Sequence, residues 1–114
     1  MLNKKIGNLG EQIAKKYYQN IGYKVLKQNY YTRYGEIDLV LEKNRQILVV
    51  EVKTRTNHRF GWAEESINDK KIDNINHTYY ILCSKEGLSS DYTLEICIIE
   101  INGSIATLKR LIPC

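Results

Sequence analysis

Two short segments carry charged side chains of the kinds that hold metal ions and act on phosphates. Residues 35–40 are Gly-Glu-Ile-Asp-Leu-Val, and residues 49–55 are Val-Val-Glu-Val-Lys-Thr-Arg. Both segments are otherwise rich in apolar residues, as buried strands are. Charges are costly in such surroundings unless something compensates them, and a divalent cation bound to a phosphate supplies that compensation. The carboxylates and the lysine therefore predict a metal site on two neighbouring strands.

A hairpin would bring these two segments together. Polar residues 43–46 separate them and predict a four-residue loop, with Glu42 facing Ile47. Because side chains alternate between the two faces of a strand, this register gathers charged groups on one face and apolar groups on the other. The charged face is expected to hold Glu36, Asp38, Glu51 and Lys53. The apolar face is expected to hold Ile37, Leu39, Leu41, Leu48, Val50 and Val52.

Asp38 falls directly opposite Glu51 in this register. Like charges at cross-strand positions destabilise a pair of strands, so the fold alone does not favour the arrangement. Two carboxylates at this spacing can, however, converge on Mg²⁺, or on Mn²⁺, which also prefers oxygen ligands. Lys53 follows on the same strand, where it would act on an attacking water or stabilise charge on a phosphate. The plainer interpretation is a solvent-facing side of an antiparallel hairpin, where such charges are ordinary.

Length and composition predict one domain spanning residues 1–114. The chain has 43% hydrophobic and 26% charged residues, which is ordinary for a globular protein. Its apolar runs are shorter than a membrane span, and the N-terminus lacks the apolar stretch of a signal peptide. Three cysteines without metal-like spacing indicate a reducing compartment, and we expect a cytoplasmic protein that does not associate with membranes.

The positive charge is concentrated near the N-terminus. Residues 1–33 contain seven Lys or Arg and one acidic residue, whereas residues 34–114 contain ten basic and twelve acidic residues. A basic segment ahead of an acidic cluster favours a surface that attracts a polyanion toward a metal site. The charge distribution therefore favours nucleic acid as a partner, although the effect is modest and many proteins have this much asymmetry.

Periodicity and capping signals predict the elements that position these groups. Apolar positions three to four residues apart indicate a first helix, and Asn68 is a good N-cap for a second one. The predicted elements are a helix over 4–21, a strand over 23–26, the hairpin over 36–54, a loop over 55–66, a helix over 69–83, and strands over 92–101 and 104–112 joined by Asn102 and Gly103. This order predicts the α/β class, with a mixed sheet flanked by helices.

The motifs taken together resemble those of the bacterial YraN family. That family is similar to the restriction-endonuclease-like nucleases, the PD-(D/E)xK superfamily, and to archaeal Holliday-junction resolvases. The resemblance covers residues 7 to about 82. It is carried by Gly7, Gly10-Glu11-x-x-Ala14, Asn29, Arg33, the two charged segments, Phe60-Gly61 and Lys71.

This resemblance implies a restriction-endonuclease-like α/β core with one metal site. By matching positions, Asp38 and Glu51 would be metal ligands and Lys53 the catalytic lysine. Glu11 would be the helix carboxylate that completes the site. Glu36 also matches a family position and is grouped with the catalytic residues, although the resemblance assigns it no role.

Basic and aromatic residues around the site are candidates for contacts to nucleic acid. Phosphate contacts are expected from Arg33, Arg55, Arg59 and Lys71, with a solvated surface as the plainer interpretation. Base stacking is a plausible role for Tyr30, Tyr31 and Tyr34. His58 and His77 have no serine or cysteine partner in the sequence pattern, so a nucleophilic triad is not supported.

The leading hypothesis is a Mg²⁺- or Mn²⁺-dependent endonuclease that hydrolyses phosphodiester bonds in DNA, with branched or recombination intermediates among the candidate substrates. Asp38 and Glu51, with the carbonyl of Val52, would hold the ion that polarises the phosphate and activates a water. The alternative is a catalytically weak or inactive nucleic-acid-binding module that assists DNA repair or recombination. A third interpretation is a protein-interaction role. Resolvases work as dimers, which leaves a homodimer open, although nothing in the sequence marks an interface.

Overall fold

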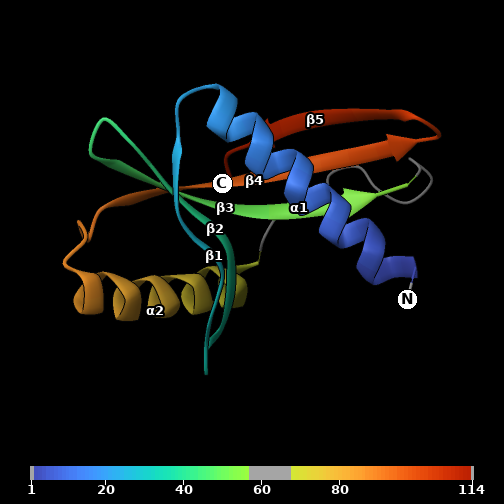
Figure 1. Cartoon of the computed structure of the whole chain (residues 1–114). Coiled ribbons are helices and arrows are strands. Elements are labelled where there is room, and N and C mark those ends of the chain that lie inside the picture. The colour runs from blue at the N-terminus through green and yellow to red at the C-terminus, as the bar shows by residue number, and fades with distance from the viewer. Residues whose placement is uncertain (1, 57–67, 114) are drawn as a thin grey trace.

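The computed structural model describes residues 2–56 and 68–113, whose elements are shown in Figure 1. In chain order these are α1 (Leu2–Asn20), β1 (Lys24–Thr32), β2 (Gly35–Lys43), β3 (Gln46–Arg55), α2 (Asp69–Glu86), β4 (Tyr92–Asn102) and β5 (Ile105–Leu111). The order of one helix, three strands, a second helix and two strands matches the order predicted from the sequence.

The strands form one five-stranded sheet in the order β1-β2-β3-β4-β5. β3 and β4 run parallel, and α2 lies in the connection between them, whereas all other neighbours are antiparallel. α1 packs on one face of the sheet and α2 on the other (Figure 1). The fold is therefore the α/β arrangement that was predicted, a mixed sheet flanked by helices.

Two apolar clusters fill the spaces between the sheet and its helices. Under α1 the buried residues are Ala14, Tyr18, Leu39, Leu41, Leu48, Val50, Cys97 and Ile99. Under α2 they are Ile37, Val40, Ile47, Val49, Ile75, Tyr79, Leu82 and Cys83. β2 and β3 contribute to both clusters, because successive side chains of a strand point to opposite faces. The hairpin therefore forms the centre of the molecule.

The predicted apolar face of the hairpin is confirmed except at one position. Leu39, Leu41, Leu48 and Val50 all lie in the cluster under α1, and Val52 packs against it. Ile37 instead belongs to the cluster under α2. The alternation of β2 is therefore broken between Ile37 and Leu39, and the residue at the break is Asp38.

Turn positions and strand lengths differ from the expectations in detail. Lys43 pairs with Gln46, so the hairpin turn has two residues, Asn44 and Arg45, both with positive φ (53° and 66°). The predicted loop was too long because arginine gives no signal for this left-handed conformation, which Asn or Gly usually marks. The β4–β5 turn is likewise shifted by one residue, since Asn102 pairs with Ile105.

β1 is longer than predicted and includes the polar residues 27–32. These residues lack the alternation of a half-buried strand, but their backbone pairs with β2 from Lys27↔Val40 to Thr32↔Gly35. Backbone pairing with a strongly apolar neighbour has overridden the local pattern. α2 also extends further than predicted, to Glu86, and ends at Gly87 in the left-handed conformation.

Candidate functional site

The candidate site lies where β2 separates from β3. The predicted register is confirmed over five pairs, from Lys43↔Gln46 to Leu39↔Val50. Beyond Leu39, β2 leaves β3 and continues beside β1 across α2 (Figure 1). The predicted pairs Asp38–Glu51 and Glu36–Lys53 are therefore not rungs of this ladder. The fork between the two strands is instead bridged by side chains.

Two carboxylates replace backbone pairing at this fork. The amide of Val52 donates to Oδ2 of Asp38 at 2.7 Å, and the amide of Asp38 donates to Oε2 of Glu51 at 3.4 Å. Each side chain therefore bonds to the backbone of the opposite strand. This exchange satisfies amides that the diverging strands leave unpaired. It also keeps the two carboxylates close together, with a second oxygen on each that can ligate a cation.

The four charged hairpin residues do not all share one face. Glu51 and Lys53 alternate with Val50 and Val52, which pack under α1, and therefore point to the α2 side. Glu36 lies before the break in alternation. It is exposed and points away from α2, because its neighbour Ile37 packs beneath that helix. The predicted common face is thus wrong for Glu36. The reason is that Asp38 turns into the gap between the strands rather than to either side.

Both carboxylates have raised pKa values. Burial is the main cause for Glu51, which is 4% exposed, whereas Lys71, the amide of Asp38 and Lys53 oppose the rise in its pKa. Burial and the charge of Glu51 raise the pKa of Asp38 to about 7, although the amide of Val52 favours its ionised form. The carboxylates therefore repel each other in partly desolvated surroundings, which is the condition that a bound cation relieves.

Glu11 adds a third carboxylate from α1. Its charge, like that of Glu36, contributes to the raised pKa of Asp38. Two contacts fix its position: Nδ2 of Asn29 donates to its Oε1 at 3.0 Å, and the preceding residue, Gly10, packs against Thr54 of β3. A Cβ on Gly10 would lie 1.8 Å from the hydroxyl oxygen of Thr54, so only glycine allows this approach. Gly10 and Asn29 were noted in the sequence only as positions that match the family. Their contacts with Thr54 and Glu11 could not be read from it.

Lys71 lies in the site itself rather than around it. Its Nζ is 3.5 Å from Oε1 of Glu51, and its side chain is 46% exposed. Asn68 caps the start of α2, as predicted, by accepting a hydrogen bond from the amide of Lys71. The helix cap therefore places this lysine directly over the buried carboxylate.

The donor set fits a hard divalent cation held by two carboxylates. No group of three or more His, Cys, Asp and Glu side chains in residues 2–56 and 68–113 is close enough to hold a metal ion together. Glu11 therefore stands near Asp38 without converging on the same point. An ion at the fork would be held by Asp38, Glu51 and a backbone carbonyl such as that of Val52, with water in its other positions, as Mg²⁺ commonly is.

The predicted phosphate-contacting residues occupy different places. Arg33 is exposed, donates to the hydroxyl of Tyr34 at 2.9 Å and lies 4.9 Å from the centre of its ring. Tyr34 in turn packs against His77 of α2. Arg55 forms an ion pair with Glu100 on β4 at 3.2 Å. Arg59 lies outside the described residues, as do His58 and the Phe60-Gly61 pair.

An ion pair between the buried Glu95 and the more exposed Arg110 on the α1 face was not predicted. Glu95 is 9% exposed and accepts two hydrogen bonds of 2.8 Å from Arg110 and one of 2.9 Å from the hydroxyl of Tyr18. These bonds connect α1 to β4 and β5. The network therefore holds α1 against the sheet and, with it, the helix that carries Glu11.

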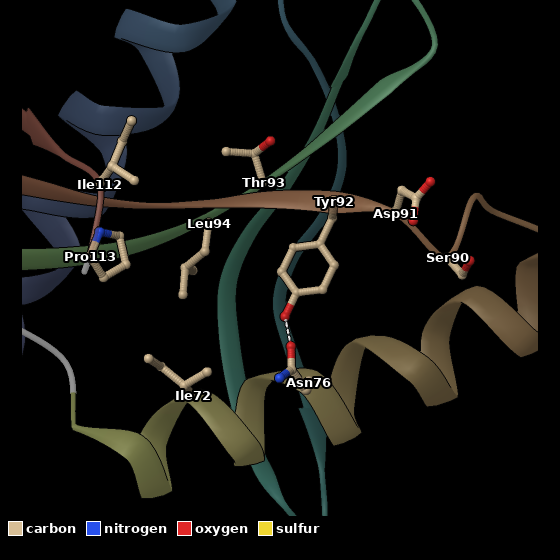
Figure 2. A pocket seen from close by; sticks show the side chains of 9 residues that line it. All are labelled: Ile72, Asn76, Ser90, Asp91, Tyr92, Thr93, Leu94, Ile112 and Pro113. Atoms are coloured by element: carbon tan, nitrogen blue, oxygen red, sulfur yellow. Dashed lines mark hydrogen bonds between the residues drawn. The ribbon is translucent and has the colours of Figure 1, made fainter.

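A groove of about 420 Å³ lies between α2, the start of β4 and the chain after β5 (Figure 2). Ile72, Leu94 and Ile112 line it, and within it the hydroxyl of Tyr92 donates to Oδ1 of Asn76. None of the site carboxylates lines this groove, so it is separate from the fork.

Neither described helix has the length and apolar character needed to cross a membrane.

Comparison with known proteins places the chain in a family. A sequence model of the uncharacterised protein family UPF0102 matches residues 10–101. A UPF0102 protein of Alkaliphilus oremlandii is 43% identical over 102 residues, covering 88% of this chain and 86% of that protein. One from Syntrophomonas wolfei is 49% identical over 74 residues, 65% of this chain and 64% of that protein. One from Vibrio parahaemolyticus is 36% identical, covering 88% and 84%. The chain belongs to the UPF0102 family, which is the YraN family indicated by its motifs.

Proposed function

We propose that this protein is a metal-dependent nuclease that hydrolyses phosphodiester bonds in DNA, with branched recombination intermediates as the first substrates to test. One observation carries the proposal. Asp38 and Glu51 are held together at the fork between β2 and β3, each bonded to the opposite backbone, and both have raised pKa values. An arrangement that is electrostatically unfavourable without a cation is typical of a functional site.

The surrounding residues suit phosphodiester hydrolysis. A Mg²⁺ or Mn²⁺ ion bound by Asp38 and Glu51 would supply polarisation of the phosphate and a water of lowered pKa. Lys53 is exposed and close enough to Glu51 to affect its pKa. From there its ammonium would orient the attacking water or stabilise negative charge on the phosphate. Glu36 and Glu11 add negative charge beside Asp38, which favours a cation at the fork.

A cleavage assay on matched substrates tests the proposal. The purified protein would be incubated with duplex, single-stranded and four-way-junction DNA in Mg²⁺ or Mn²⁺. We expect cleavage by the wild type and none by Asp38→Asn, Glu51→Gln or Lys53→Met, with circular dichroism showing that each variant is folded. Lys70→Gln, which changes an exposed lysine outside the proposed machinery, should cleave like the wild type. Intact DNA in every wild-type reaction would rule out the enzyme.

A nucleic-acid-binding module without catalysis is the second candidate, and one observation favours it. Within the described ranges the fork offers two carboxylates and no third metal-binding side chain, so an ion there would depend heavily on water. Such a module would bind DNA in a salt-sensitive manner. Its binding would be the same in EDTA and in Mg²⁺, and the same for Asp38→Asn. The nuclease should instead show DNA binding that responds to both changes.

A further inference from the structure

The contact between Lys71 and Glu51 joins a mobile cation to a fixed anion. The side chain of Glu51 is 5% exposed and is anchored through Oε2 to the amide of Asp38. The side chain of Lys71 is 46% exposed, and its Nζ lies 3.5 Å from the other oxygen, Oε1. Lysine carries its charge on a flexible four-carbon stem. The carboxylate therefore cannot leave this position easily, whereas the ammonium can.

The position of Lys71 on its helix indicates that its charge serves Glu51. It lies in the first turn of α2, two residues after Asp69. The N-terminus of a helix carries partial positive charge, so a cation there is disfavoured by roughly 0.3–1 kcal/mol. An ionised carboxylate buried without a partner costs several kcal/mol. The cost of leaving Glu51 without a counter-ion is therefore larger than the cost of placing Lys71 at the helix N-terminus. This difference explains why a lysine is stable at a helix end that favours anions.

Lys71 and a divalent cation would compete for the same carboxylate. The ammonium lies against the oxygen of Glu51 that is not bonded to the backbone, and a metal ligated by Glu51 would need that oxygen or its immediate surroundings. Two cations beside one carboxylate repel each other strongly when the surroundings exclude water. Because about half of the Lys71 side chain already faces solvent, moving it away costs little packing.

We propose that Lys71 is the resident counter-ion of Glu51, that a divalent cation displaces it, and that the released ammonium then binds a phosphate of the substrate. The inference rests on the proposed function, because it assumes a cation site at the fork. It assigns Lys71 two successive contacts, first with Glu51 and then with the substrate phosphate, and so differs from a simple peripheral contact to DNA. Binding of the phosphate would draw Lys71 further from Glu51, so cation and substrate would each strengthen the binding of the other.

A simple surface ion pair makes different predictions. Exposed ion pairs typically contribute less than about 1 kcal/mol to the free energy of unfolding. Loss of such a pair would not be expected to change the binding of a metal ion. If Lys71 were only such a pair, removing its charge would not alter the affinity for a metal ion. If it competes with the ion, removing its charge must raise that affinity.

The test is calorimetric titration of the full chain with Mn²⁺ alone, at pH 8 and low ionic strength. The variants are Lys71→Gln, which removes the charge, Lys71→Arg, which keeps it, and Lys70→Gln, which removes a neighbouring exposed charge. We expect Lys71→Gln to bind Mn²⁺ roughly three- to tenfold more tightly than the wild type. Lys71→Arg and Lys70→Gln should stay within about twofold. In EDTA, Lys71→Gln should also have the lowest melting temperature of the four proteins, because Glu51 has lost its counter-ion.

The outcomes separate the inference from the proposed function. Mn²⁺ binding by the wild type with equal or weaker binding by Lys71→Gln would overturn the inference and leave the metal site intact. Equal tightening in Lys71→Gln and Lys70→Gln would also overturn it, since general electrostatics would then suffice. Absence of Mn²⁺ binding in all four proteins would overturn the metal site, and the inference with it. Tighter binding in Lys71→Gln alone supports both.

Discussion

Replacing Asp38 by asparagine should stabilise the protein in the absence of metal. The substitution removes the charge that burial and Glu51 disfavour, and it keeps an oxygen that can accept the hydrogen bond from the amide of Val52. If the charge of Asp38 instead stabilised the folded protein, the same substitution would lower the free energy of unfolding. The prediction therefore tests directly whether the fork is electrostatically strained.

The magnitude follows from the raised pKa of Asp38. The change from 3.8 to about 7 corresponds to roughly 4 kcal/mol at about 1.4 kcal/mol per unit, which is an upper bound because the side chain is partly exposed. Between these two values the folded protein keeps a proton that the unfolded chain releases, so this group lowers stability as pH rises through the window. Above about 7 the penalty is complete. A net gain of roughly 2–4 kcal/mol for Asp38→Asn at pH 8 would raise the melting temperature by roughly 8–16 °C, at about 4 °C per kcal/mol.

Thermal unfolding in EDTA, followed by circular dichroism at pH 5 and pH 8, measures this effect. The difference between variant and wild type should be more than halved at pH 5, where the folded wild type holds its proton. Asp73→Asn, which changes an exposed carboxylate of α2, serves as the control and should shift the melting temperature little at either pH. Adding Mn²⁺ should raise the melting temperature of the wild type and not that of Asp38→Asn.

Two results would refute the reasoning. The first is an Asp38→Asn protein that melts at or below the wild-type temperature in EDTA at pH 8. Asp38 would then stabilise the fold through its hydrogen bond, and no cation would be needed to explain the fork. The second is a stabilisation of the same size at pH 5 and pH 8, which would show that its cause is not the charge.

Three further predictions, one with a matched control variant, test how the fold positions the site, each by urea unfolding. Gly10→Ala should destabilise the protein by roughly 1–3 kcal/mol because its Cβ would meet the Thr54 hydroxyl at 1.8 Å. The control Gly7→Ala, with open space around it, should stabilise the protein by roughly 0.5–1 kcal/mol. Equal effects of the two substitutions would contradict the close approach of α1 to β3. Asn68→Ala should cost about 1 kcal/mol through loss of the N-cap, and no loss would argue against that cap. Glu95→Gln should cost roughly 1–3 kcal/mol by weakening the charged hydrogen bonds from Arg110 and the hydroxyl of Tyr18, and an unchanged midpoint would show that the pair contributes no stability.

The central hairpin was predictable because its pattern is local. Apolar residues alternate on either side of a polar turn, and a slip of one residue would expose the core face, so the register could be derived from numbering alone. The observed pairs from Leu39↔Val50 to Lys43↔Gln46 confirm it. Over these five pairs only the turn was mistaken, because the left-handed conformation of Arg45 has no signature in the residue type.

The geometry at Asp38 could not be derived in the same way. The alternation rule assumes that both strands continue side by side, whereas β2 leaves β3 after Leu39 to pair with β1. The part of β1 that causes this departure, residues 27–32, is polar and shows no strand periodicity. The residue types therefore indicated which two carboxylates lie close together, and a distant pairing decided how they meet.

The contacts of Glu11 and Lys71 depend on where two helices cross the sheet, which no local pattern reports. Gly10 allows α1 to touch Thr54, and the Asn68 cap fixes where α2 begins. These two points of the backbone bring one acidic and one basic side chain to the fork from opposite faces. In the proposed function, Glu11 would help to attract a cation to the fork, and Lys71 would compete with that cation for Glu51. Stability of the fold alone does not explain why Glu11 and Lys71 both approach the fork. The presence of both charges therefore favours the proposed ligand site more strongly than either charge alone.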